Sequence, residues 1–226
     1  MQPNGRFALA LLLAWFALWL PLAIEPFNRS DWLLENALAV AAIALLAATW
    51  RSFPLSRTSY ALIFTFLALH TIGAHYTYSE VPYDDWSRRM LGFSIDALFG
   101  WERNNFDRMV HFGYGLLLAY PIRELFLRVA AVKGFWGYFL PLDLTMSSSA
   151  LYEMVEWAAA VAFGGDLGAA FLGSQGDPWD AQKDMALASL GALIAMCVTA
   201  AVNYRCQRDF AREWQESLRV KRRAPL

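Results

Sequence analysis

The chain has 226 residues, of which 58% are hydrophobic, 15% are aromatic and only 17% are charged, and its formal net charge is −1. A soluble domain of this length carries more charge and less apolar content, so the composition excludes an ordinary soluble domain. The balanced charge gives no support for a nucleic-acid partner, and the ten tryptophans suit the aromatic belts at a membrane surface.

The apolar residues are gathered in long runs. These runs occupy residues 7–24, 32–50, 60–76, 109–127, 135–163 and 185–202. Each run is close to or longer than the roughly 20 residues that cross a bilayer as a helix. A cleaved signal peptide is the alternative for the first run, but no small-residue cleavage site follows it. We therefore predict an all-α, polytopic membrane helical bundle of about six transmembrane helices, with a short amphipathic segment, residues 90–101, on the membrane surface.

The predicted spans form a single transmembrane domain, residues 1–204, which a basic amphipathic tail follows, residues 205–226. Lysine and arginine are enriched in cytoplasmic loops, so their distribution predicts the orientation. An even number of spans places both termini on one side, together with Arg6, Arg51, Arg57, Arg123, Arg128, Lys133 and the basic residues of the tail. The opposite side receives the smaller set Arg29, Arg88, Arg89, Arg103, Arg108 and Lys183. We expect both termini to be cytoplasmic, and the chain to be a multi-pass protein of the bacterial inner membrane with membrane lipids around it.

This orientation brings most of the ionisable side chains at membrane depth toward the outer leaflet. They are His70, His75, Asp107, Arg108, His111, Glu153, Glu156, Asp177, Asp180 and Asp184. Residues three or four apart share one face of a helix, which applies to Asp107 with His111, to Glu153 with Glu156, and to Asp180 with Asp184. Ionisable residues at membrane depth are functional candidates by default. We therefore predict one outward-facing pocket, with His75 at its mouth.

Two carboxylates as close as Glu153 and Glu156 cannot easily both be charged without a cation, a shared proton or an arginine such as Arg108. Histidine with carboxylates suits zinc or manganese, whereas an all-oxygen site suits magnesium. We favour a divalent metal over a shared proton, because Asp107 lies four residues before His111 and could orient it as a ligand. The predicted metal ligands are His75, His111, Glu153 and Asp184.

The predicted catalytic residues are Asp107, Arg108, His111, Glu153, Glu156, Asp180 and Asp184. Asp107 would orient His111 as a general base or metal ligand, and Arg108 could hold a phosphate. The first hypothesis is an intramembrane site that acts on or binds a lipid-linked or cell-envelope substrate, and whether the protein is an enzyme stays open. The alternatives are a proton- or cation-coupled transporter and a non-catalytic membrane scaffold. Against transport, the ionisable groups cluster at one leaflet and no inverted repeat is visible, although a homodimer could supply the missing pathway.

Five segments of the sequence resemble the YjdF-type family of bacterial inner-membrane proteins. They are residues 70–78, 81–83, 107–111, 152–157 and 176–185, so the resemblance covers most of the chain. It implies an inner-membrane location.

A weaker similarity, over roughly the second half of the chain, is to VanZ-like membrane proteins, the group named for teicoplanin resistance. Asp107, His111, Glu153, Asp184 and Gly191 match its pattern, whereas Arg108, Glu156 and Ala188 replace a lysine, a glutamine and an asparagine. The similarity implies a role in the cell envelope, and the departures make the site more acidic.

Overall fold

The computed structural model describes residues 3–165, 174–206 and 210–219. Within these ranges the chain forms α-helices and no β-strand, which confirms the predicted all-α class. The helices are α1 (Pro3–Leu22), α2 (Arg29–Thr49), α3 (Arg57–His75), α4 (Tyr83–Leu91), α5 (Ile95–Phe99), α6 (Phe106–Val129), α7 (Trp136–Phe163), α9 (Asp180–Cys206) and α10 (Phe210–Ser217).

Three of the described helices are long and apolar enough to cross a membrane by length and composition. They are α1 (from Asn4 to Leu22), α2 and α9. Helices α3, α6 and α7 have 19, 24 and 28 residues and lie in the same bundle, but they are not among these three. The number of spans and the cytoplasmic side of the termini stay predictions.

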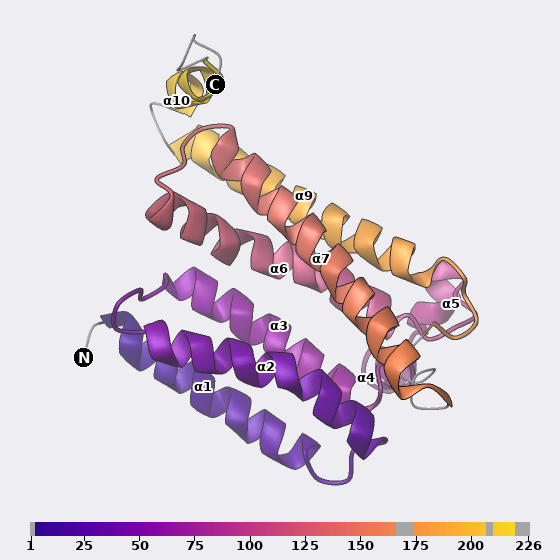
Figure 1. The fold of residues 1–226 in the computed structure, drawn as a ribbon. Coiled ribbons are helices and arrows are strands. Elements are labelled where there is room, and N and C mark those ends of the chain that lie inside the picture. The colour runs from indigo at the N-terminus through magenta and orange to yellow at the C-terminus, as the bar shows by residue number, and fades with distance from the viewer. Residues whose placement is uncertain (1–2, 166–173, 207–209, 220–226) are drawn as a thin grey trace.

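The long helices form two layers (Figure 1). Helices α1, α2 and α3 make one layer, and α6, α7 and α9 make the other, with α3 packed against α6 between them. The short helices α4 and α5 lie at one end of the bundle, where α3 and α7 end and α2, α6 and α9 begin. The beginning of α1 and the helix α10 lie at the opposite end. Segments far apart in the sequence therefore meet at the α4–α5 end.

Helices α6 and α9 approach each other closely because glycines face each other across their contact. A Cβ atom on Gly115 would overlap the backbone of Ala188 and Ala192, and one on Gly191 would overlap the backbone of Phe112. Small residues at a contact let two membrane helices come within reach of each other's backbones. This contact fixes the first turns of α6 against the first turns of α9.

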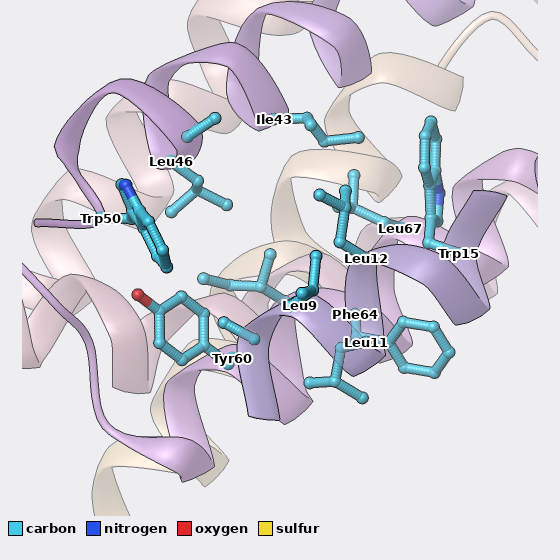
Figure 2. A pocket seen from close by; sticks show the side chains of 13 residues that line it. Leu9, Leu11, Leu12, Trp15, Ile43, Leu46, Trp50, Tyr60, Phe64 and Leu67 are labelled. Carbon is cyan, nitrogen blue, oxygen red and sulfur yellow. The ribbon is translucent and has the colours of Figure 1, made fainter. Parts of the chain in front are cut away.

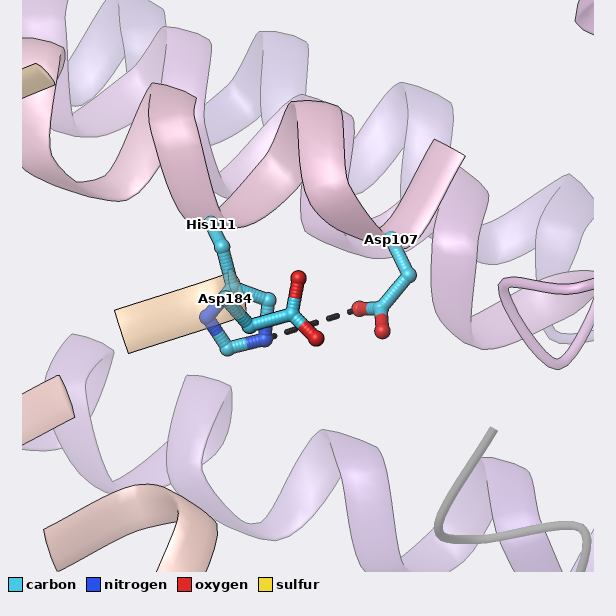
Figure 3. A group of neighbouring side chains, drawn as sticks. All are labelled: Asp107, His111 and Asp184. Atoms are coloured by element: carbon cyan, nitrogen blue, oxygen red, sulfur yellow. Dashed lines mark ion pairs between the residues drawn. The ribbon is translucent and has the colours of Figure 1, made fainter. Parts of the chain in front are cut away.

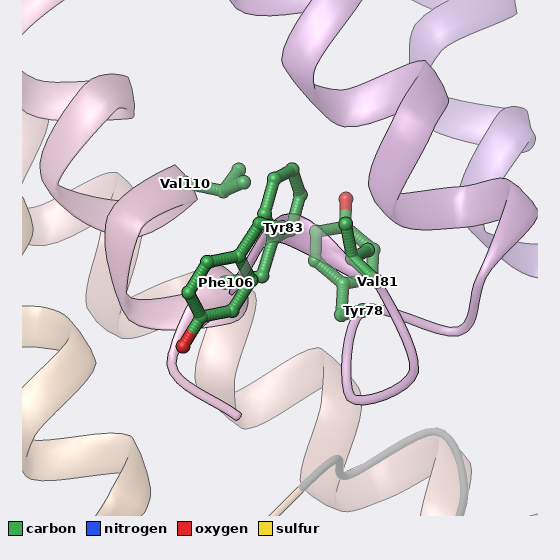
Figure 4. Close-up of a cluster of buried hydrophobic side chains, with 5 residues drawn as sticks. All are labelled: Tyr78, Val81, Tyr83, Phe106 and Val110. Atoms are coloured by element: carbon green, nitrogen blue, oxygen red, sulfur yellow. The ribbon is translucent and has the colours of Figure 1, made fainter. Parts of the chain in front are cut away.

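The start of α6 is held by a buried cluster of aromatic and aliphatic side chains from the α3–α4 turn, α4 and α6 (Figure 4). Its members are Tyr78, Val81, Tyr83, Phe106 and Val110. The Tyr83 hydroxyl also accepts a hydrogen bond from the backbone N–H of Asn105, at 3.1 Å. Burial of five such side chains is worth several kcal/mol at about 25 cal/mol per Å² of apolar surface. The cluster therefore holds in place the first turns of α6, which carry its polar residues.

The amphipathic helix α10 folds back on the turn that precedes α7. Its Phe210 and Trp214 pack on Tyr138, and the Ser217 hydroxyl accepts a hydrogen bond from the backbone N–H of Phe135 at 3.0 Å. The predicted tail thus includes a docked helix. Most of its basic run, residues 219–223, lies outside the described residues.

Candidate functional site

The centre of the candidate site joins the first turns of α6 and α9 (Figure 3). Asp107 and His111 on α6 and Asp184 on α9 each offer a ligand atom, and these atoms lie within 4.8 Å of one another. The four-residue spacing places Asp107 and His111 on one face of α6, and the close contact of α6 with α9 brings Asp184 opposite to them. His111 and Asp184 are buried.

The His111 imidazole lies between two carboxylates. Its Nε2 atom is 3.6 Å from Asp107 Oδ1 and 3.5 Å from Glu153 Oε1. Both separations exceed the usual range of N–H···O hydrogen bonds, and a single ring nitrogen carries at most one hydrogen. Neither separation is that of a normal hydrogen bond from His111 Nε2.

Glu153 and Glu156 on α7 are both buried, with 9% and 8% of their surface exposed. They lie three residues apart and so share one face of α7. Within the described residues, Glu153 Oε1 and Asp184 Oδ1 are buried without a hydrogen-bond partner. Unpaired buried carboxylate oxygens are costly, so this group calls for a cation or a proton.

Arginine side chains neutralise a different set of acids from the one expected. Arg103 Nη1 lies 2.7 Å and Arg108 Nη2 lies 3.0 Å from Asp180 Oδ1. Arg108 and Lys183 also pair with Asp177. Arg108 follows Asp107 directly and so projects about 100° around the helix, away from the face that carries His111. Arg108 and Asp180 therefore belong to an outer ion-pair network, whereas the sequence suggested Arg108 as the partner of Glu153 and Glu156.

Asp177 lies in the loop that precedes α9. Its Oδ1 accepts a hydrogen bond from the backbone N–H of Trp179, and α9 begins only at Asp180. The hydrogen bond from Lys183, followed by those from Trp179 and Arg108, holds the pKa of the Asp177 carboxyl well below its usual range. Asp177 is therefore charged at neutral pH, between the cationic groups of Arg108 and Lys183.

The other two histidines are engaged elsewhere. His70 Nε2 lies 3.1 Å from the Glu35 carbonyl oxygen, so this nitrogen donates and Nδ1 accepts from the Tyr78 hydroxyl. His75 Nδ1 donates to the Leu22 carbonyl oxygen at 2.8 Å and thereby fastens the α1–α2 turn. The structure does not bring His75 together with the Asp107, His111 and Asp184 group, although the sequence suggested His75 as a metal ligand at the mouth.

Two acids that the sequence analysis passed over complete the polar end. Asp31 and Glu35 lie one turn apart on α2 and are buried, with 2% and 5% of their surface exposed. Glu35 Oε2 accepts a hydrogen bond from the Tyr152 hydroxyl at 3.3 Å, which links α2 to α7. The sequence could have identified Glu35, because a glutamate within the apolar run 32–50 is an ionisable residue at membrane depth.

A cavity of about 490 Å³ runs between α2, α3, α6 and α7. Its polar lining lies toward the α4–α5 end of these helices and comprises Asp31, Glu35, His70, Thr77, Tyr78, Asp107, His111, Tyr114, Ser148, Ser149, Tyr152 and Glu156. The lining continues along α2 to Leu46 and along α6 to Ile122, through aliphatic side chains. Fifteen residues of helix span roughly 22 Å, so the cavity is a long slot with one acidic end and one apolar end.

A second cavity, of about 260 Å³, lies between α1, α2 and α3 (Figure 2). No carboxylate or histidine of the described chain lines it; Trp15, Trp50 and leucines do. Leu46, Ile63 and Leu67 line both cavities, so the second cavity adjoins the apolar end of the first.

Comparison with known proteins identifies the family. The family model described as Predicted membrane protein (DUF2238) matches residues 7–205. Inner membrane protein YjdF of Escherichia coli (strain K12) is 37% identical over 188 residues, which cover 83% of this chain and 86% of that protein. These matches confirm the predicted YjdF-type resemblance and the inner-membrane location, and they do not show the similarity to VanZ-like proteins. No solved structure matches the chain. The chain belongs to the DUF2238 family of membrane proteins.

Proposed function

We propose that this membrane protein binds a lipid-linked or other amphiphilic envelope molecule in the slot and acts on its polar head with a divalent metal ion. The observation that carries the proposal is the form of the slot. Its outward end is lined by Asp107, His111 and Glu156, and its inward end by aliphatic side chains. Ligand sites of this kind combine an apolar wall with a few convergent polar groups, and the long apolar part here suits an alkyl chain.

The metal site we propose consists of Asp107, His111 and Asp184, with Glu153 beside them. Two ligand atoms on a tetrahedral zinc ion at about 2.0–2.1 Å lie about 3.3 Å apart. The separations of 3.5 and 3.6 Å between His111 Nε2 and its two carboxylate neighbours are close to this value. The unpaired Glu153 Oε1 and Asp184 Oδ1 atoms would also gain a partner. One histidine with carboxylates favours zinc or manganese over magnesium, which prefers oxygen ligands.

A metal held by three protein groups keeps a coordination position for water or substrate, as in catalytic sites. The ion would lower the pKa of a bound water, and Glu153 or Glu156 could accept its proton. Asp180 and Arg108 would be positioning residues. Their ion pair would hold the first turn of α9 and with it the position of Asp184. The supported reaction class is metal-assisted hydrolysis or transfer at the head of an amphiphile.

Metal content tests the proposal. We expect purified protein to contain about one zinc or manganese ion per chain, and chelation to lower its Tm, because a ligand that binds only the folded state stabilises it. The variants His111→Gln, Glu153→Gln and Asp184→Asn should lose both the metal and the response to chelator.

The exposed acid Asp143, on the inward half of α7, offers a matched control. Asp143→Asn should keep the wild-type metal content and the wild-type response. Metal-free wild-type protein that is indifferent to chelator would refute the metal. A shared proton between Glu153 and Glu156 would then explain the site, and Glu156→Gln would be neutral or stabilising because it removes the repulsion between them.

A further inference from the structure

The outward end of the slot is lined by four carboxylic acids from three helices. These are Asp31, Glu35, Asp107 and Glu156. None of the described side chains that line the slot is a lysine or an arginine. Asp107 belongs to the proposed metal site, whereas Asp31 and Glu35 come from α2, on the far side of the slot. The α2 acids therefore require a separate explanation.

Asp31 is the least explained of these acids. Its Oδ1 atom is buried and has no hydrogen-bond partner in the described chain. Helix capping does not account for it, since Asn28 accepts the backbone N–H groups of Ser30 and Asp31. Arg29 turns elsewhere, because it donates to the Ala23 carbonyl oxygen and lies over the Trp32 ring.

Ser149 on α7 shows the same property on the opposite wall. It is 2% exposed, lines the slot, and its hydroxyl has no hydrogen-bond partner in the described chain. Buried polar atoms are almost always paired, so two unpaired ones that face one cavity indicate a ligand with hydrogen-bonding groups.

We infer that the head group bound at this end of the slot is a positively charged amine, held by Asp31 and Glu35. This inference rests on the proposed function and names the chemical class of its ligand. An ammonium group has three hydrogen-bond donors and no acceptor. It therefore complements carboxylates, which only accept hydrogen bonds when they are ionised. A phosphate between Asp31 and Glu35 would face like charges, and no lysine or arginine of the described lining would offset them. The alkyl chain of the same molecule would lie along Ala42, Leu46 and Ile122.

Three probes with the same chain and different heads test the inference: dodecylamine, dodecanol and dodecyl phosphate. The protein is held in a non-ionic amphipol, and affinity is measured from the rise in Tm with probe concentration. We expect dodecylamine to bind at least tenfold more tightly than the other two. Asp31→Asn and Glu35→Gln should each weaken dodecylamine at least tenfold. The exposed-acid variant Asp143→Asn should bind as the wild type does.

A second measurement uses only the wild-type protein, so it does not depend on the variants folding. An alkylamine with a diazirine at the end of its chain should label the inward part of the slot, around Leu46 and Ile122. Excess dodecylamine should suppress the label. Ala42→Phe should also suppress it, because Ala42 lines the slot, whereas Ala41→Phe, on an exposed face of α2, should not.

The outcomes separate the two proposals. Equal affinity for dodecanol and dodecylamine would overturn the amine head but leave an amphiphile in the slot. Tighter binding of dodecyl phosphate would overturn it too, and would place the head on the metal. Label spread over the lipid-facing side of α7, with no binding of any probe, would overturn both the amine and the amphiphile. If the wild-type protein still contained metal in that case, only the metal-site part of the proposed function would remain supported.

Discussion

At the residue scale, two aspartates one turn apart on α9 have opposite surroundings. Asp180 is paired with Arg103 and Arg108, whereas Asp184 lies one turn deeper, where no arginine contact is found in the described chain. The basic side chains stop at the outer turn because they enter from the end of the bundle. Asp184 therefore lacks the direct ion pair that Asp180 has, and this lack motivates the proposal that a metal ion or a proton neutralises the inner acids.

The outer network gives a prediction for Asp177. Its pKa is lowered in the folded protein, chiefly by Lys183, so the ion pairs add stability above the usual value of 3.8 and lose it as the pH falls through the folded-state pKa. We expect Asp177→Asn to lower the Tm at pH 7 and to flatten the fall in Tm between about pH 5 and 3. Thermal melts of the wild type and the variant across this pH range measure the two Tm profiles. The exposed Asp85→Asn should leave the profile unchanged, and an Asp177→Asn profile parallel to the wild type would contradict the network.

The residues that sequence reasoning could assign were those with helical spacing. Asp107 with His111 and Glu153 with Glu156 follow from periodicity alone, and the structure brings them to one end of the bundle. Helical spacing turns Arg108 away from the His111 face, but which acids it pairs with could not be predicted, since a long side chain selects among several acids by rotamer. The part that Glu35 plays was readable in principle, because it interrupts an apolar run.

At the scale of elements, the α6–α9 contact determines the geometry of the site. His111 and Asp184 face each other only if Gly115 and Gly191 allow the two backbones to approach. The helices themselves could be predicted from apolar length, but their pairing could not. Pairing depends on which small residues meet across two segments that are far apart in the sequence.

The pair of variants Gly191→Ala and Gly113→Ala tests this contact. A Cβ on Gly191 would overlap the Phe112 backbone, whereas the closest atom to one on Gly113 is 3.7 Å away, an ordinary contact. We expect Gly191→Ala to cost about 1–3 kcal/mol, the usual range for overpacking, and to reduce metal binding. Gly113→Ala should be neutral or slightly stabilising, because alanine favours helix. Equal Tm values and equal metal content for the two variants would show that the contact does not position the site.

At the scale of the whole molecule, the two layers are joined mainly through α3 and α6, and α2 contacts its neighbours less extensively. The slot lies where α2 stands apart from α6 and α7. Composition predicted a helical membrane bundle, and this was confirmed. The slot could not be predicted, because a cavity depends on how imperfectly several helices pack and not on the pattern of any one of them.

The orientation of the bundle decides which compartment the site faces. The beginning of α1 and the helix α10 lie at one end of the bundle, and α4 and α5 lie at the other (Figure 1), near the acids at the start of α6 and α9. The larger share of lysine and arginine lies toward the first end, including Arg51, Arg57 and Lys133 in its turns, so that end should be cytoplasmic. Alkaline phosphatase fused after Gln175, in the loop before α9, should be active, and the same enzyme fused after Leu226 should be inactive. Reporter activity in the reverse pattern would place the acidic end of the slot in the cytoplasm, and a substrate from the outer face of the membrane could then no longer reach it directly.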